Sequence, residues 1–176
     1  MASENLDFRR CRATDASLLR QVATACYAPY YRDLWEPGGM EAYLDTLYEP
    51  VALASELADP NLQFEIAYRR GDPVGFSKLH FRCDRAGIRN AAYLERVYVA
   101  PAVTGTGVGT QLIERMIAGA RDCGRDWIWL QAMADAKKPL ERYFTLGFAE
   151  CEQTLLDAPR VRPGRAAMVV LRKQLR

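Results

Sequence analysis

One segment restricts the possible folds of this chain more than any other, and its pattern is that of a strand, a glycine-rich turn and a helix. Residues 91–100 are rich in Tyr, Leu and Val and end at Pro101, as a largely buried strand does. Three glycines follow, at positions 105, 107 and 109. The next residues form one apolar stripe at helical spacing, which ends at Gly124 and consists of Val108, Leu112, Ile113, Met116, Ile117, Ala120 and Cys123. The segment predicts a strand–turn–helix unit of an α/β fold.

The glycine turn has the composition of a phosphate-binding site. Glycines allow the backbone to approach a ligand closely, and a helix N-terminus presents unpaired N–H groups with a partial positive charge. Two common nucleotide motifs are excluded, because Thr110 stands where a Rossmann fingerprint needs glycine and no lysine follows as in a Walker loop. The segment therefore predicts a cradle for a pyrophosphate, and a glycine-rich turn without a ligand is the alternative.

The remaining pattern predicts a single α/β domain over residues 1–176, with a mixed sheet of about seven strands flanked by helices. A first helix starts near Thr14 or Asp15, and Pro29 is expected to end it. Two short helices are expected at 40–47 and 51–57, and a further helix at 138–146. The other strands are expected at 8–11, 64–68, 74–81, 126–132, 148–155 and 167–171.

Composition excludes several classes of function. The net charge of +2, with no basic run interleaved with aromatic residues, argues against nucleic-acid binding. No stretch has the roughly 20 apolar residues of a membrane span, and residues 1–10 lack the apolar region of a signal peptide. Five scattered cysteines without a C-x-x-C pair, and the lone His80, predict neither disulfides nor a metal site. We expect a metal-free cytoplasmic protein in which His80 packs or caps.

Two motifs resemble those of the GNAT superfamily of N-acetyltransferases. Residues 94–101, followed by Thr104-x-x-Gly107-x-Gly109, are similar to the coenzyme A-binding motif of that family, and residues 143–148 are similar to its tyrosine-x-x-x-glycine-phenylalanine signature. The resemblance implies the GNAT fold and the acetyl donor acetyl-CoA. It also implies a set of coenzyme-binding residues: Val97, Val99, Thr104, Gly105, Thr106, Gly107, Val108 and Gly109. Thr104 replaces the family's usual Gln or Arg, and Ala136 replaces an Asn that contacts the coenzyme in many members.

The resemblance also implies two catalytic residues. Glu95 matches the carboxylate that acts as general base in some members, and simple strand alternation places it on the same side as Val97 and Val99. Its alternative is an ordinary strand carboxylate paired with Arg96 or with a cross-strand neighbour. Tyr143 matches the acid that protonates the leaving thiolate, because a phenol holds its proton more tightly than a thiol. Its alternative is a core tyrosine that packs against the coenzyme.

The acceptor is expected near residues 27–48, where Tyr31, Trp35 and Glu36 are candidate contacts. Aromatic faces and carboxylates suit a cationic amine, although most of these aromatic residues would equally serve to pack the helices. A weaker similarity links this region to the bacterial polyamine acetyltransferases. We therefore expect an acetyltransferase for a small-molecule amine, with a homodimer left open. A protein or peptide N-acetyltransferase and a non-catalytic acyl-CoA-binding module are the alternatives.

Overall fold

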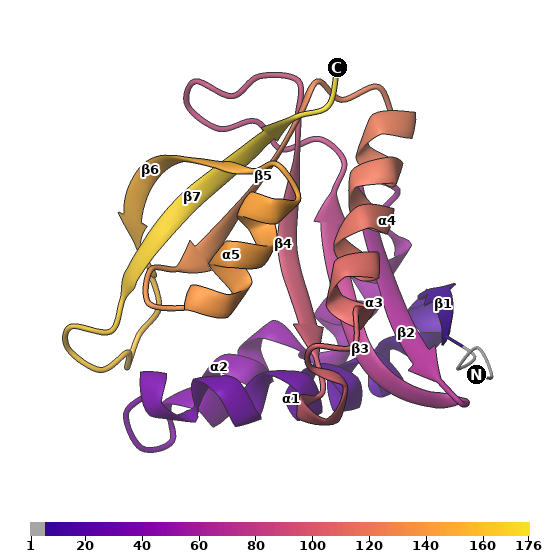
Figure 1. The fold of residues 1–176 in the computed structure, drawn as a ribbon. Helices are drawn as coiled ribbons and strands as arrows, with labels where there is room; N and C mark the ends of the chain where they lie inside the picture. Colours follow the sequence, from indigo (N-terminus) through magenta and orange to yellow (C-terminus); the bar gives the residue numbers. More distant parts are fainter. Residues whose placement is uncertain (1–5) are drawn as a thin grey trace.

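The fold is built on one seven-stranded sheet with helices on both faces, seen in a computed structural model that describes residues 6–176 (Figure 1). The expectation about a signal peptide falls partly on residues 1–5, which lie outside the described residues. The strands are β1 (Leu6–Arg10), β2 (Leu62–Arg69), β3 (Asp72–His80), β4 (Ala91–Val99), β5 (Trp127–Met133), β6 (Ala149–Leu155) and β7 (Ala167–Gln174). The helices are α1 (Ala16–Tyr31), α2 (Gly39–Leu47), α3 (Pro50–Ala58), α4 (Val108–Asp122) and α5 (Lys137–Thr145). The predicted mixed seven-stranded α/β sheet is thus confirmed.

The sheet has the strand order β1-β2-β3-β4-β5-β7-β6, and every neighbouring pair is antiparallel except β4 and β5. These two parallel strands are paired only from Ala91–Tyr93 to Trp127–Trp129. Both strands continue for several residues beyond that contact, so their carboxyl halves diverge. Figure 1 shows the carboxyl halves of β4 and β5 parting. Residues of both strands line two of the cavities described below.

A β-bulge in β4 lies at the start of this divergence. Lys78 pairs with Arg96, but Leu79 pairs with Leu94, so Glu95 is an extra residue without a partner on β3. Bulges bend a strand and increase its local twist, which helps to turn β4 away from β5. The bulge also shifts the alternation of side chains between the two faces of the sheet.

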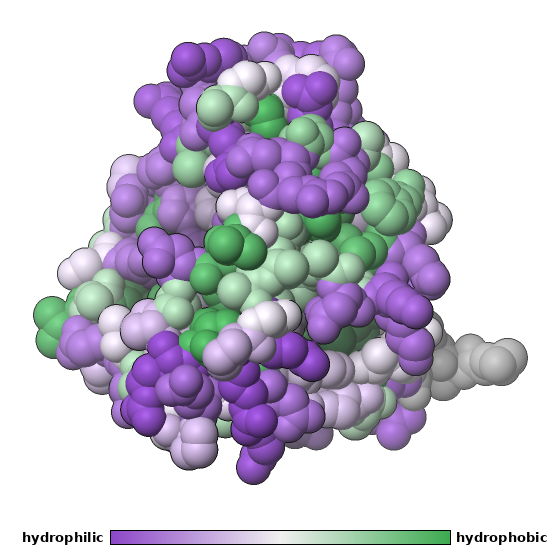
Figure 2. All heavy atoms as spheres, turned by 90° about the vertical axis from the view of Figure 1, so that its left-hand side faces the viewer, coloured by the Kyte–Doolittle hydropathy of each residue, from purple (hydrophilic) through white to green (hydrophobic). Residues whose placement is uncertain are grey.

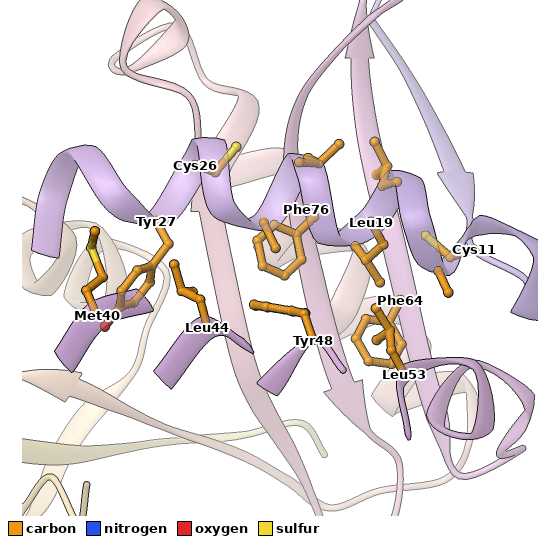
Figure 3. Close-up of a cluster of buried hydrophobic side chains, with 14 of the residues drawn as sticks. Cys11, Leu19, Cys26, Tyr27, Met40, Leu44, Tyr48, Leu53, Phe64 and Phe76 are labelled. Carbon is orange, nitrogen blue, oxygen red and sulfur yellow. The ribbon is translucent and has the colours of Figure 1, made fainter. Parts of the chain in front are cut away.

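Two main apolar cores, one on each face of the sheet, hold the helices in place. Helices α1, α2 and α3 cover one face over buried residues that include Phe64 and Phe76, as Figure 3 shows. Helix α4 covers the other face, where its predicted apolar stripe is buried from Val108 to Ala120 and includes Leu112 and Met116. Cys123, the last residue predicted for the stripe, is exposed and follows the end of α4. Burial of large apolar side chains is the dominant stabilising contribution to a fold of this kind.

One end of α1 differs from its prediction, whereas the other agrees with it, because Asp15 is the N-cap residue. Pro29 does not end α1, which runs on to Tyr31. A proline near the end of a helix removes only one hydrogen bond, and here Tyr31 is held by stacking on Tyr27 with ring centroids 4.5 Å apart. At the other end, α1 is preceded by a short 3₁₀ turn (Ala13–Asp15), and the Asp15 carboxylate accepts the Arg12 backbone N–H at 2.8 Å.

Positive φ values mark two turns between these elements. Arg70 and Gly71, between β2 and β3, have φ values of 57° and 90°, as a tight hairpin requires. Gly124 has a φ of 74° directly after the end of α4. Across residues 6–176, no helix combines the length and apolar character needed to cross a bilayer. Figure 2 views the side of β6 and β7 and shows apolar residues at the centre of this face, with hydrophilic residues above and below.

Candidate active site

The predicted glycine turn lies between β4 and α4, and its backbone is open on one side. Gly105 and Gly107 have φ values of 82° and 91°, and a Cβ atom added at either would meet nothing within 4 Å. The first backbone hydrogen bond of α4 joins the Gln111 N–H to the Gly107 carbonyl at 3.0 Å. The N–H groups of residues 108–110 therefore precede the first bond of the helix, and Gly107 offers no side chain to cap them. This arrangement suits an anionic group.

Three neighbouring cavities connect this turn to the interior. The glycine-turn cavity, of about 530 Å³, is lined by residues of β4, the turn, α4 and α5, which are Val97, Val99, Val103, Thr104, Gly105, Gly107, Gly109, Thr110, Ile113, Lys138, Pro139, Glu141, Arg142, Tyr143 and Thr145. The central cavity, also about 530 Å³, shares Val97, Val99, Thr104, Lys138 and Pro139 with it. The inner chamber, of about 140 Å³, shares Tyr31, Leu34, Tyr98 and Met133 with the central cavity. The three cavities thus form one series between the diverging strands.

The inner chamber is lined mainly by tyrosines. Their rings come from α1, α2 and β4 and are those of Tyr27, Tyr31, Tyr43, Tyr93 and Tyr98. They contact one another at centroid distances such as 5.8 Å for Tyr31 and Tyr98, so the walls are held by ring packing. The polar groups of the chamber are Glu95, Arg96 and Gln131. Burial raises the pKa of Tyr31 to about 12, so its hydroxyl keeps its proton at neutral pH.

Glu95 lies at the wall of this chamber, on the opposite face of the sheet from the one that simple alternation predicts. Because of the bulge, Val97 and Val99 face α4, whereas Glu95 shares the chamber with Tyr27 of α1 and Tyr43 of α2. Alternation fails here because β4 has one extra residue, Glu95, between the partners of Lys78 and Leu79. The prediction that Glu95 lies on the side of the two valines is therefore corrected.

The Glu95 carboxylate is surrounded by basic side chains. It forms ion pairs with Lys78 at 2.8 Å and with Arg96, and it is hydrogen bonded to His80 Nε2 at 2.5 Å. Burial by itself would raise the pKa of Glu95, but the His80 hydrogen bond and the charges of Arg96 and Lys78 lower it to about 2. Glu95 is therefore an ion at neutral pH and a weak proton acceptor when it acts alone.

The contacts of Glu95 with Arg96 and with Lys78 of β3 match the alternative drawn from the sequence, a carboxylate paired with Arg96 or with a cross-strand neighbour, although the sequence did not single out Lys78. Lys78 has only 3% of its side chain exposed and also pairs with Glu56 of α3 at 2.9 Å. Arg96 is 8% exposed, and its Nη1 atom has no hydrogen-bond partner among the described residues. The available signal was the presence of Lys78 and Arg96 within strands that are otherwise largely apolar. Buried cations need acidic partners, so these two residues indicated a buried carboxylate nearby. The expectation that His80 packs or caps omitted its contact with a candidate catalytic residue.

Tyr143 lies in α5, on the wall of the glycine-turn cavity that also contains Val97. Its ring packs edge-on against Phe148 at a centroid distance of 5.7 Å, which fixes its orientation. Burial raises the pKa of its hydroxyl above the ordinary value. Tyr143 thus carries a proton at neutral pH next to the predicted coenzyme-binding residues. Lys138 and Arg142 of α5 line the same cavity, and sequence reasoning did not select either of them.

The three candidate acceptor contacts, Tyr31, Trp35 and Glu36, lie in different surroundings. Tyr31 lines both the inner chamber and the central cavity. Trp35 is only 1% exposed, and its indole N–H donates to the Tyr27 hydroxyl at 3.2 Å, so its placement favours a packing role. Glu36 is exposed and lines none of the three cavities. The structure thus places Tyr31 at the cavities, whereas Trp35 packs in the core and Glu36 lies at the surface.

The two departures from the family motif also have a defined environment. The Thr104 hydroxyl is 2.6 Å from the Tyr30 hydroxyl, so the turn is tied to the end of α1. Ala136 lines the central cavity just before α5. The predicted coenzyme-binding residues Thr106 and Val108 sit within the turn, where the Thr106 hydroxyl donates to the Val103 carbonyl at 2.7 Å and Val108 is buried beneath it. These two residues shape the turn from behind. In residues 6–176, no three His, Cys, Asp or Glu side chains come together as metal ligands.

Comparison with solved structures shows which proteins share this architecture. The PaiA N-acetyltransferase from Thermoplasma acidophilum, in complex with coenzyme A, superposes with a TM-score of 0.75 at 19% identity, covering 97% of this chain and 99% of that one. An acetyltransferase from Salmonella typhimurium with its cofactor acetyl-CoA has a TM-score of 0.66 at 20% identity, with coverages of 97% and 94%. The ribosomal-protein-S18-alanine N-acetyltransferase from Escherichia coli has a TM-score of 0.71 at 17% identity, with the same coverages.

Sequence comparison agrees with the fold. An uncharacterized N-acetyltransferase from Mycobacterium bovis is 26% identical over 135 residues, which are 77% of this chain and 83% of that protein. The family model of the acetyltransferase (GNAT) family matches residues 22–148, which contain the glycine turn, the chamber-lining strands and Tyr143. Because this match spans more than half of the chain, including both motifs found in the sequence, the chain belongs to the GNAT family of acetyltransferases.

Proposed function

We propose that this protein transfers the acetyl group of acetyl-CoA to the primary amine of a small, cationic acceptor, by direct attack while both substrates are bound. The observation that carries the proposal is the series of cavities from the glycine turn, past Tyr143, to the tyrosine-lined chamber. A donor and an acceptor can approach it from opposite ends and meet in the central cavity. The coenzyme complexes of two proteins with the same fold add support.

The residues present fit a coenzyme A molecule. The open backbone of Gly105 and Gly107 and the free N–H groups at the start of α4 suit the pyrophosphate. Val97 and Val99 line the path toward the chamber, and Lys138 and Arg142 offer positive charge on the opposite wall. Acetyl-CoA supplies the acetyl group as a thioester.

The side chains of the protein account for the proton movements of this reaction. An amine must lose its positive charge before it attacks, so a proton must leave the acceptor nitrogen, and Glu95 is the carboxylate at the chamber wall that would receive it. As the new N–C bond forms and the C–S bond breaks, the Tyr143 hydroxyl donates its proton to the departing sulfur. The nitrogen loses a second proton as the amide forms, and this proton returns through water to Tyr143, so one proton is released in total.

The size and lining of the inner chamber favour a small acceptor. Its volume of about 140 Å³ suits an alkylamine rather than a polypeptide. The faces of Tyr31 and its neighbours attract an ammonium ion by cation–π interaction, typically worth about 0.5–2 kcal/mol. Attraction by Glu95 is reduced because Lys78 and Arg96 already balance its charge.

A protein acceptor is the second candidate, because the ribosomal-protein-S18-alanine N-acetyltransferase shares the fold. Release of free coenzyme A should be measured with monoamines, diamines, amino acids and peptides with a free N-terminus. Turnover of small amines at rates well above those of peptides is expected. Turnover of peptides alone would contradict the small-acceptor proposal, and binding of acetyl-CoA without any turnover would indicate a non-catalytic module.

A further inference from the structure

We propose that His80 acts through Glu95 as a proton relay, which carries the proton of the acceptor amine from the inner chamber to solvent on the far side of β4. The inference rests on the proposed function and deepens it. It starts from the position of Glu95, which lines the chamber and is hydrogen bonded to His80 Nε2 at 2.5 Å. His80 belongs to β3, lines none of the three cavities, and has 24% of its side chain exposed.

A relay is needed because Glu95 is a poor final acceptor. Moving a proton from an alkylammonium, with a reference pKa of about 10.4, to a carboxylate with a pKa of about 2 is unfavourable by a factor of ~10⁸. Moving the same proton to bulk water at pH 7 is unfavourable only by a factor of ~10³ to 10⁴. The proton must therefore pass through Glu95 and not remain there.

The contacts of Glu95 leave one route for the proton, which leads to His80. Glu95 is also bound by Lys78 and Arg96, which carry protons of their own and cannot accept another. Tyr93 packs beside the imidazole with ring centroids 5.5 Å apart. Glu56 of α3 faces this group only through its ion pair with Lys78. Among the described neighbours of Glu95, the imidazole is thus the group with two ring nitrogens, of which one can accept a proton while the other releases one.

The step balances in protons without another reactant. The N–H bond of the ammonium breaks, and its proton joins the Glu95 carboxylate. The transfer runs through the tautomer of His80 whose ring proton is on Nδ1, because Nε2 must be free to accept. The protonated Glu95 passes its proton to Nε2, and the imidazole becomes charged for a moment. It then releases the proton on Nδ1 to water, and the tautomers exchange through solvent. The net change is one proton moved from the amine to bulk water.

The experiment compares His80→Gln with wild type and with Arg82→Gln. Glutamine keeps a side-chain donor for Glu95 but cannot relay a proton. Arg82 is an exposed residue just after the same strand, with a side chain that makes no hydrogen bond or ion pair in the described part of the chain. With an amine that wild type acetylates, His80→Gln should lower kcat at pH 7 by about 10-fold to 100-fold, within the usual range for proton-transfer catalysis. The deficit should shrink toward pH 10, where free amine is available, and KM for acetyl-CoA should stay near wild type.

A second variant separates a relay from a structural role. His80→Ala should regain activity when imidazole is added, in proportion to the concentration of its neutral form. A His80→Gln enzyme with wild-type kcat and pH profile, or a deficit equal at all pH values without imidazole rescue, would overturn the relay. If wild type acetylates no amine at all, the proposed function fails and the relay falls with it.

Discussion

Gly107→Ala tests the assignment of the glycine turn, and Gly71→Ala provides a matched control. The two glycines have nearly equal φ values of 91° and 90°, and a Cβ added at either position meets nothing within 4 Å. The variants therefore suffer the same backbone strain and no steric clash within the protein. Only Gly107 lies at the N-terminus of α4, where we propose that the coenzyme pyrophosphate binds.

The expected loss of stability is the same for both variants. A non-glycine residue in a left-handed conformation costs about 1–2 kcal/mol. For a chain of this size, each kcal/mol lowers Tm by about 2–4 °C, so both variants should melt about 2–8 °C below wild type. The new methyl group of Gly107→Ala projects into the space that the pyrophosphate would occupy. Loss of close backbone contact should weaken coenzyme A binding by about 10-fold or more, equivalent to at least ~1.4 kcal/mol.

Calorimetric titration with coenzyme A, together with thermal melting in its absence, separates the two effects. We expect parallel Tm losses and a weaker Kd for Gly107→Ala alone. Equal Kd values for wild type, Gly71→Ala and Gly107→Ala would refute the assignment of this turn as the pyrophosphate site. Equal losses of affinity in both variants would instead attribute the effect to reduced stability.

Three further predictions concern the proposed catalytic groups, Tyr143 and Glu95. Tyr143→Phe should lower kcat by about 10²-fold or more with a smaller change in KM, because a leaving-group acid acts in the transition state; a near-normal kcat under conditions where chemistry limits the rate would return Tyr143 to a packing role. Glu95→Gln should depress kcat/KM at neutral pH and lose less at alkaline pH, where free amine exists, and parallel pH profiles of variant and wild type would place the base elsewhere. The fold lowers the pKa of Glu95 from the ordinary glutamate value of 4.5 to about 2, so its ionisation stabilises the folded state by about 3 kcal/mol above pH 4.5, and this is lost as pH falls toward 2. Urea unfolding between pH 5 and 2 should therefore show a weaker pH dependence for Glu95→Gln than for wild type, and identical slopes would contradict the ion-pair account.

Local sequence determines the glycine turn and the helix that follows it. The turn needs positive φ at positions 105 and 107, which glycine adopts without the strain that other residues would suffer. The apolar stripe from Val108 onward faces the core because its spacing matches the helical repeat. The same is true of the hairpin at Gly71. Each of these features depends on residues that are close in the chain, so pattern and composition suffice to predict it.

The tertiary structure decided the side chains around Glu95. The bulge that moves Glu95 to the tyrosine-lined face arises from how β3 and β4 pair, which alternation along one strand does not reveal. The contacts of Glu95 with Lys78 and His80 join residues 15 or more positions apart, and the burial of Trp35 depends on Tyr27 and Tyr43 of two helices. A short stretch of sequence fixes backbone preferences, but the environment that sets the pKa of a side chain is assembled by strands and helices that meet only in the folded chain.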